Sequence, residues 1–176
     1  MVFDAPATGH GLAFFKVPRM TMEMVKMGPL HTKAFRMWNL LTDPERTSFN
    51  IVTLPEEMPV NESIELDAAA KEIGLPPGKV LVNGVYPPLF SENGFSGELD
   101  RLSSAARPVD GVAGEISRFA LEAARVERGR ARMHRELIER LAKALPAREM
   151  LELPFLFEAE IGPLELETLA ERLTEL

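Results

Sequence analysis

Short apolar runs alternate with amphipathic stretches of helical length, and this alternation constrains the fold more than any other feature. Three runs, Phe49–Leu54, Lys79–Asn83 and Met150–Leu153, are typical of strands. The stretch Asn61–Ile73 has helical periodicity and stops at Gly74, a common helix end. Strands joined through helices favour right-handed parallel crossovers over an antiparallel meander. We therefore predict an α/β fold with a mostly parallel sheet and helical crossovers.

Two longer helical regions accompany the strands. The pattern over 18–48 predicts a helical hairpin whose break is Gly28-Pro29. Over 111–145 the apolar spacing of about 3.6 residues predicts one long helix, interrupted by a polar turn at Arg130. Its Glu- and Arg-rich face is typical of a solvated surface, more so than of a docking patch.

The remaining segments of residues 1–176 belong with these elements to part of a single domain. The Pro- and Gly-rich segment 87–114 predicts a connection with one short helix around Leu99, and Pro163–Leu176 predicts a last amphipathic helix. No apolar run reaches the roughly 18 to 20 residues that span a bilayer.

The first residues carry the first candidate for chemistry. Val2–Asp4 reads as the end of a buried strand, which places Asp4 where Mg-dependent nucleotide hydrolases hold the metal's water shell. The following loop, Ala5–His10, offers backbone N–H groups, a hydroxyl and a glycine that could sense a γ-phosphate. An aspartate after a strand is also common as a turn or helix cap, and the residue types leave both readings open.

Charge and composition exclude several classes of function. With 27 acidic and 20 basic residues the net charge is -7, the wrong sign for nucleic-acid binding. There is no cysteine, which removes disulfides, thiolate nucleophiles and cysteine-based zinc sites. The three histidines have no metal-ligand spacing. The N-terminus lacks the pattern of a secretory signal, so we expect a cytoplasmic protein.

A phosphate-binding loop is absent from these 176 residues. Such a loop has the pattern G-x4-G-K-S/T between a strand and a helix, so that backbone amides and a lysine surround the β-phosphate. The nearest segment, Gly74–Lys79, has the wrong glycine spacing, contains prolines where donors are needed, and leads into a strand.

Four segments occur in an order that points to a family. They are MVFDAPATGHGLAFFKVPR, VTLPEEMPVNESIEL, KVLVNGVYP and ELPFLFEAEIGPLELETLAERL. In this order they resemble the switch II region, the strand-P-E segment, the VNxxxP segment and the closing strand-P element of ArsA-type ATPases. That family holds arsenite-pump ATPases and ATPases that target tail-anchored proteins. The resemblance extends over nearly the whole chain.

The resemblance implies an ATPase that uses ATP and Mg²⁺. Asp4 corresponds to the switch II, or Walker B, aspartate, which contacts Mg²⁺ through water. Thr8, Gly9 and His10 correspond to the switch that responds to the nucleotide state.

It also implies a site for the base. Asn83 would contact the adenine ring, since an asparagine offers both a donor and an acceptor to a base edge. The other residues implied to close the base pocket are Pro87, Pro154 and Phe155, the last two belonging to the loop that runs to Phe157.

Glu56 and Glu62 match acidic positions that in the family lie near the dimer interface and the nucleotide. Each also has an ordinary structural reading. Glu56 would then be a solvent-facing loop carboxylate, and Glu62 an acid in the first turn of a helix, favoured by the helix dipole.

The absent phosphate loop qualifies the resemblance. It implies a partial P-loop NTPase domain of the deviant Walker A class, the C-terminal portion that begins at switch II without the N-terminal P-loop half. Two hypotheses follow: an ATP-hydrolysing enzyme that couples nucleotide state to a transporter or targeting partner, or a catalytically inactive chain that binds nucleotide or dimerises with a full-length ATPase. Both imply a homodimer or a heterodimer with a related chain.

Methionines are concentrated in the hairpin, where five of the nine lie between Met20 and Met37. Flexible thioether side chains suit a membrane-protein client. A packed hairpin or a dimer surface is the more ordinary explanation, since the hairpin is short for a client groove.

Overall fold

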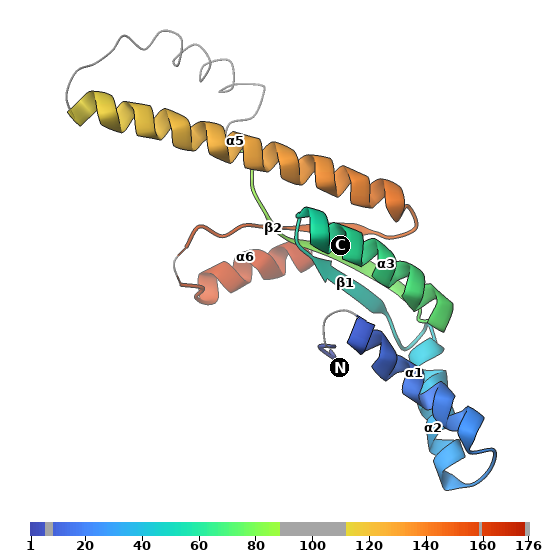
Figure 1. The fold of residues 1–176 in the computed structure, drawn as a ribbon. Helices are drawn as coiled ribbons and strands as arrows, with labels where there is room; N and C mark the ends of the chain where they lie inside the picture. Colours follow the sequence, from blue (N-terminus) through green and yellow to red (C-terminus); the bar gives the residue numbers. More distant parts are fainter. Residues whose placement is uncertain (6–8, 89–111, 159, 175–176) are drawn as a thin grey trace.

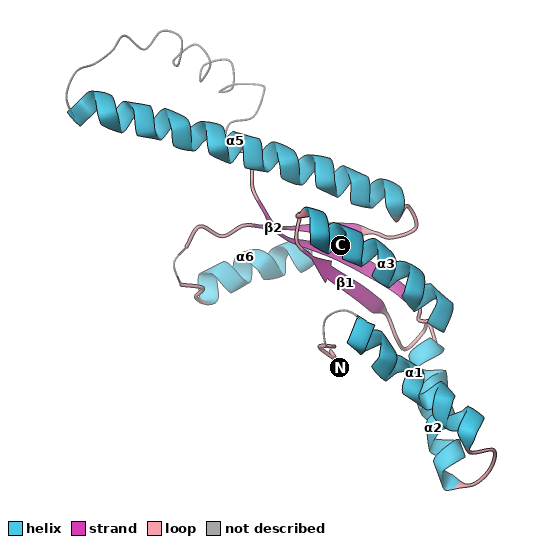
Figure 2. Ribbon diagram, viewed as in Figure 1, coloured by secondary structure: helices cyan, strands magenta, loops and turns pink. Residues whose placement is uncertain are grey.

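The computed structural model describes residues 1–5, 9–88, 112–158 and 160–174. Its centre is a parallel sheet of three strands in the order β1-β2-β3, flanked by helices (Figures 1 and 2). The strands are β1 (Phe49–Thr53), β2 (Pro77–Val85) and β3 (Met150–Pro154). The helices are α1 (Gly9–Met24), α2 (Pro29–Thr42), α3 (Glu57–Ile73), α5 (Val112–Ala144) and α6 (Pro163–Thr174). The predicted α/β fold with a parallel sheet is confirmed.

One face of the sheet is covered by α3 and α5 and holds the main core. Pairing of Ile51 with Val80, and of Thr53 with Val82, directs alternate side chains of both strands to this face. The buried residues of this core are Ile51, Val60, Val80, Val82, Val85, Ile138, Leu141 and Leu145. Helix α6 contacts β3. The helices that connect the parallel strands, α3 and α5, thus cover a face of the sheet that would otherwise be exposed.

The helical hairpin α1–α2 is joined to the end of α3 by a second apolar cluster. Leu12 and Phe15 of α1 pack there with Ile73 and Leu75. Met20, Met24 and Met27 remain exposed, together with other large apolar side chains of the hairpin. These three methionines therefore do not pack in the interior of the hairpin.

Helix α3 ends at Gly74, as the sequence predicts. Gly74 has φ 91, in the left-handed region that glycine adopts without a Cβ clash, and its N–H donates to the carbonyls of Ala70 and Lys71. Leu75 can then turn back into the apolar cluster and lead to β2.

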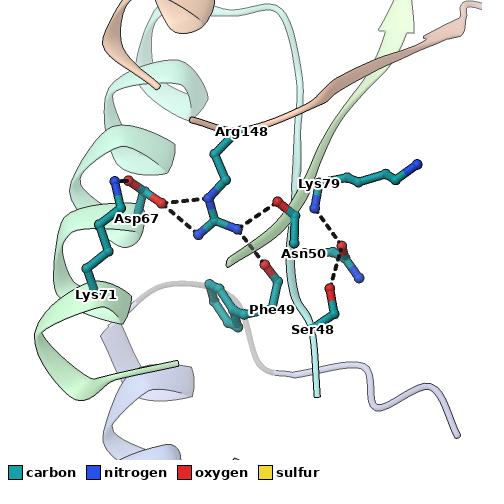
Figure 3. Close-up of polar contacts among 8 residues, drawn as sticks. Ser48, Phe49, Asn50, Asp67, Lys71, Lys79 and Arg148 are labelled. Carbon is teal, nitrogen blue, oxygen red and sulfur yellow. Dashed lines mark hydrogen bonds and ion pairs between the residues drawn. The ribbon is translucent and has the colours of Figure 1, made fainter. Parts of the chain in front are cut away.

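A buried ion pair holds the amino ends of the strands together (Figure 3). Arg148, just before β3, donates from Nε to Asp67 Oδ1 of α3 over 2.8 Å, and its Nη2 lies 2.6 Å from the same oxygen. Its Nη1 donates to the carbonyls of Phe49 and Gly78 at 2.7 and 3.0 Å. Lys71 Nζ lies 2.6 Å from Asp67 Oδ2. One guanidinium therefore contacts β1, β2 and α3.

Three local predictions are wrong. Val2–Asp4 is not a strand: it pairs with none of the described strands, and the Phe3 ring instead stacks on Phe14 of α1 at 5.7 Å. The hairpin begins at Gly9, well before residue 18, because Leu12 and Phe15 supply apolar contacts that extend α1.

The polar turn predicted at Arg130 is also absent. Helix α5 is continuous from Val112 to Ala144, because the Arg130 side chain reaches Tyr86 while the apolar residues that follow keep helical spacing. The short helix predicted around Leu99 lies outside the described residues. Among the described helices, none is both long enough and apolar enough to cross a membrane.

Candidate functional site

The carboxyl ends of the three strands meet at one edge of the sheet. A methyl group added to Gly84 of β2 would lie 3.9 Å from side-chain carbons of both Leu54, just after β1, and Phe155, just after β3. The Phe155 N–H donates to the Val85 carbonyl over 2.8 Å. In open parallel sheets ligands bind at this edge, which makes it the candidate site.

A β-bulge at Asn83 and Gly84 shapes the edge. Val82 pairs with Glu152 and Val85 with Pro154, so β2 has one residue more than β3 over this interval. Gly84 has φ 71, which lets the strand accommodate that residue. The Asn83 side chain is exposed and forms no hydrogen bond with the described residues. Its amide is therefore available to a ligand.

Aromatic rings gather beside the bulge. The ring of Tyr86 stacks on Phe155 with centroids 4.6 Å apart and 23° between planes, and Phe157 meets both rings edge-on at 5.5 and 5.1 Å. Phe155 is 39% exposed and Phe157 55%. The edge thus offers a flat apolar surface of the kind on which a base stacks.

Two side chains of α5 reach the same cluster. Arg130 Nη1 donates to the Tyr86 hydroxyl over 2.7 Å, and the guanidinium lies 4.9 Å from the ring centroid. Buried His134 accepts a 3.2 Å hydrogen bond at Nδ1 from the Tyr86 N–H. Burial, then the charge of Arg130, lowers the pKa of His134 below its ordinary value, against the opposing effect of the Glu56 carboxylate. His134 is therefore neutral near pH 7.

The two glutamates implied to lie near the nucleotide have different positions. Glu56 is the residue before α3, on the connection that leaves the carboxyl end of β1, and its charge acts on His134. Glu62 is exposed on α3. The first-turn reading of Glu62 is wrong, because α3 begins at Glu57 and not at Asn61, so Glu62 lies in the second turn.

The residues assigned to the switch are arranged differently from the expectation. Asp4 is exposed in the segment 1–5, follows no strand, and forms no hydrogen bond or ion pair with the described residues. Gly9 and His10 lie in the first turn of α1 rather than in a loop, and Thr8 lies outside the described residues. Within the described ranges no group of three or more His, Cys, Asp or Glu could hold a metal ion.

Asn83 lies near the end of β2 and Pro87 follows that strand, while Pro154 ends β3 and Phe155 follows it, all at the carboxyl ends of neighbouring strands. Sequence reasoning missed Tyr86, Arg130 and His134. The available signal was their spacing: Arg130 and His134 are four residues apart on the helix, and His134 continues the apolar face of Ile138 and Leu141.

Comparison with known proteins supports the resemblance. Residues 26–98 match the family model of the anion-transporting ATPases. This segment is therefore similar to the ArsA-type ATPase family. The chain is 34% identical over 87 residues to "ATPase BagA" of Mycobacterium tuberculosis, and 36% identical over 70 residues to "ATPase GET3B" of Arabidopsis thaliana.

These matches cover part of each protein. They take in 49% and 40% of this chain, and 25% and 17% of the two relatives, so the chain spans about a quarter or less of the relatives it matches. The three parallel strands with helical crossovers are consistent with part of a P-loop NTPase fold. The family match includes Glu56, Glu62, Asn83 and Pro87, whereas His134 and Phe155 lie outside it.

Proposed function

We propose that this chain forms the base-binding side of an ArsA-type ATPase site and takes the adenine of ATP at the carboxyl edge of its sheet. The observation that carries the proposal is the exposed amide of Asn83, which forms no hydrogen bond with the described residues, at the sheet edge where the partly exposed ring of Phe155 follows β3. The amide can both donate to and accept from a base edge, and the ring offers a stacking face. Pro87 and Pro154 would border the bound base.

The residues present fit the base better than they fit the phosphates. The 176 residues contain no G-x4-G-K-S/T pattern, so this chain offers no lysine-and-amide cradle. Mg²⁺ would supply charge neutralisation for the phosphates of bound ATP. Asp4 is the residue of this chain that we assign to its water shell, with Thr8, Gly9 and His10 as the switch. Glu56 and Glu62 border the nucleotide or a dimer interface.

In this proposal the protein is a cytoplasmic ATPase that acts as a dimer with itself or a related chain. It couples nucleotide state to a transporter or a membrane-protein client, and the exposed methionines of α1 support an apolar partner. The second candidate is a catalytically inactive chain that binds nucleotide or dimerises with a related ATPase.

Base binding is tested on the ¹⁵N-labelled chain with adenosine and guanosine, which carry no phosphates. We expect adenosine to shift amide signals of residues 83–87 and 154–157 at millimolar concentration, and guanosine to bind more weakly. Asn83→Ala should reduce that preference, whereas Asn39→Ala, an exposed asparagine of α2, should leave it unchanged. Equal shifts with both nucleosides, or shifts elsewhere only, would contradict the proposal.

Hydrolysis separates the two candidates. With ATP and Mg²⁺ the 176-residue chain should show no activity above background and bind ATP weakly, because most charge stabilisation of the phosphates is missing. Micromolar ATP affinity by calorimetry would overturn that expectation. Activity that appears on adding a related ATPase, and that Asp4→Asn of this chain removes, would favour the enzyme over the inactive partner.

A further inference from the structure

Tyr86 is held from α5 at two points. Its hydroxyl accepts from Arg130 Nη1 over 2.7 Å, and its backbone N–H donates to His134 Nδ1 over 3.2 Å. Arg130 and His134 are one helical turn apart, so both project from the same face of α5. The two contacts fix the backbone and the far end of the tyrosine together.

The held tyrosine in turn supports the ring proposed to stack on the base. One face of Tyr86 lies against Phe155 at 4.6 Å, and the His134 ring meets Tyr86 edge-on at 5.2 Å. Phe155 follows β3 and has no other stacked aromatic neighbour among the described residues. Tyr86 therefore supplies the stacking contact of the Phe155 ring, which Phe157 meets edge-on.

We propose that Arg130 and His134 are positioning residues for the base: by holding Tyr86 they fix the ring of Phe155 at the carboxyl end of the sheet, so that the base-binding surface forms only while α5 is docked on the sheet. The inference rests on the proposed function. It adds to that function a link between the long helix and the nucleotide pocket, so that whatever moves α5 changes base affinity.

The hydrogen bond from Tyr86 requires neutral imidazole. Protonated His134 would carry a hydrogen at Nδ1 and could no longer accept from the Tyr86 N–H. The charged or titratable groups that act on His134 are Arg130 on α5, the Glu56 carboxylate before α3, and Tyr86 itself. Burial and Arg130 favour the neutral form, so the contact should persist at neutral pH and break in acid.

The first experiment needs no nucleotide. The chain has one tyrosine, so ¹⁵N-tyrosine labelling gives one backbone amide signal, that of Tyr86. We expect this signal to titrate below pH 6.5 in the wild type and in His31→Asn, a control on α2. His134→Asn keeps an acceptor near the position of Nδ1 and should abolish the titration, while His134→Leu should move the signal at every pH. If His134→Leu and Arg130→Gln leave the Tyr86 signal in place, the proposal that α5 holds Tyr86 is wrong.

The second experiment measures adenosine affinity by the same signals. His134→Leu and Arg130→Gln should each weaken binding roughly two- to tenfold, as expected for one lost hydrogen bond. His134→Asn should retain affinity, as should Arg132→Gln, whose arginine pairs with Glu136 on the exposed face. If the first two variants move the Tyr86 signal but bind adenosine as the wild type does, the positioning role is wrong and the proposed function stands. If the wild type binds no adenosine, the proposed function fails and the positioning role fails with it, even where the Tyr86 signal still responds to the α5 variants.

Discussion

The Arg148 guanidinium and the Asp67 carboxylate lie 2.6 Å apart with 1% and 3% of their side chains exposed. Arg148 also donates to the carbonyls that begin β1 and β2, so the pair joins a helix to the amino ends of neighbouring strands. The opposite edge of the same sheet carries the bulge and the aromatic cluster. The ion pair therefore fixes the strand positions on which the candidate site depends.

Removing one partner should be costly because the other charge stays buried. We expect Arg148→Met to lower the free energy of unfolding by about 3 to 5 kcal/mol in urea denaturation. Lys71→Met, which removes the half-exposed partner of Asp67, should cost about 1 kcal/mol or less. The double variant Arg148→Met with Asp67→Leu should lose less than the sum of the two single changes. A cost for Arg148→Met no larger than that for Lys71→Met would contradict this account.

The same pair predicts how stability depends on acid. Burial raises the pKa of Asp67, but hydrogen bonds and charges from Lys71 and Arg148 outweigh it and hold the pKa below its ordinary 3.8. The unfolded chain then takes up this proton first as the pH falls, so the stabilisation is complete above pH 3.8 and is lost below it. Stability should fall more steeply in acid for the wild type than for Asp67→Asn. Glu149→Gln, at an exposed ion pair, should keep the wild-type slope.

Two glycines provide a matched test of packing near the ion pair. A Cβ at Gly78 would collide with Asn50 Oδ1 and Ser48 Oγ, whereas a Cβ at Gly129 of α5 meets nothing within 4 Å. Gly78→Ala should cost about 1 to 3 kcal/mol, because a strand or its neighbours must shift. Gly129→Ala should instead stabilise by about 0.5 to 1 kcal/mol, since alanine favours the helix interior. Thermal unfolding of both variants tests this prediction. Changes in stability of the same sign for both variants would contradict it.

Local patterns were sufficient to predict the strands and most helices. Each strand is an apolar run that ends at a proline or a polar turn. Gly74 directly follows the last residue of α3, where the sequence predicts the end of that helix. The Arg148–Asp67 pair was not predictable, because its members are 81 residues apart and Asp67 resembles an ordinary surface acid of a helix. Topology alone brings them together.

The candidate site was predicted in part for the same reason. Asn83 and Phe155 lie in short motifs that can be recognised in the sequence. Tyr86 and His134 meet across 48 residues, and only the docking of α5 makes His134 an acceptor for the strand. The strand expected at Val2–Asp4 needed a hydrogen-bonded neighbour, which the described sheet does not give it.

The free side of β1 predicts self-association. β1 pairs with β2 alone among the described strands, and Val52 is 68% exposed on it. Unpaired edges with apolar side chains invite pairing with another chain. We expect oligomers at high concentration by light scattering, reduced by Val52→Lys. A sharp monomer peak for the wild type at high concentration would refute this.

The bulge gives a last prediction that links backbone conformation to the site. Gly84 has φ 71, and a Cβ there makes only ordinary contacts at 3.9 Å, so backbone strain and not crowding decides the outcome. Gly84→Ala should cost about 1 to 2 kcal/mol, because an alanine disfavours the left-handed region. Gly84→Asn has a larger side chain but tolerates that region, so it should cost less. If strain forces the bulge to relax, Asn83 changes register, and the Tyr86 amide signal should move in Gly84→Ala and stay nearly in place in Gly84→Asn. A larger loss of stability for asparagine than for alanine would show that space at the edge, and not the backbone, limits position 84.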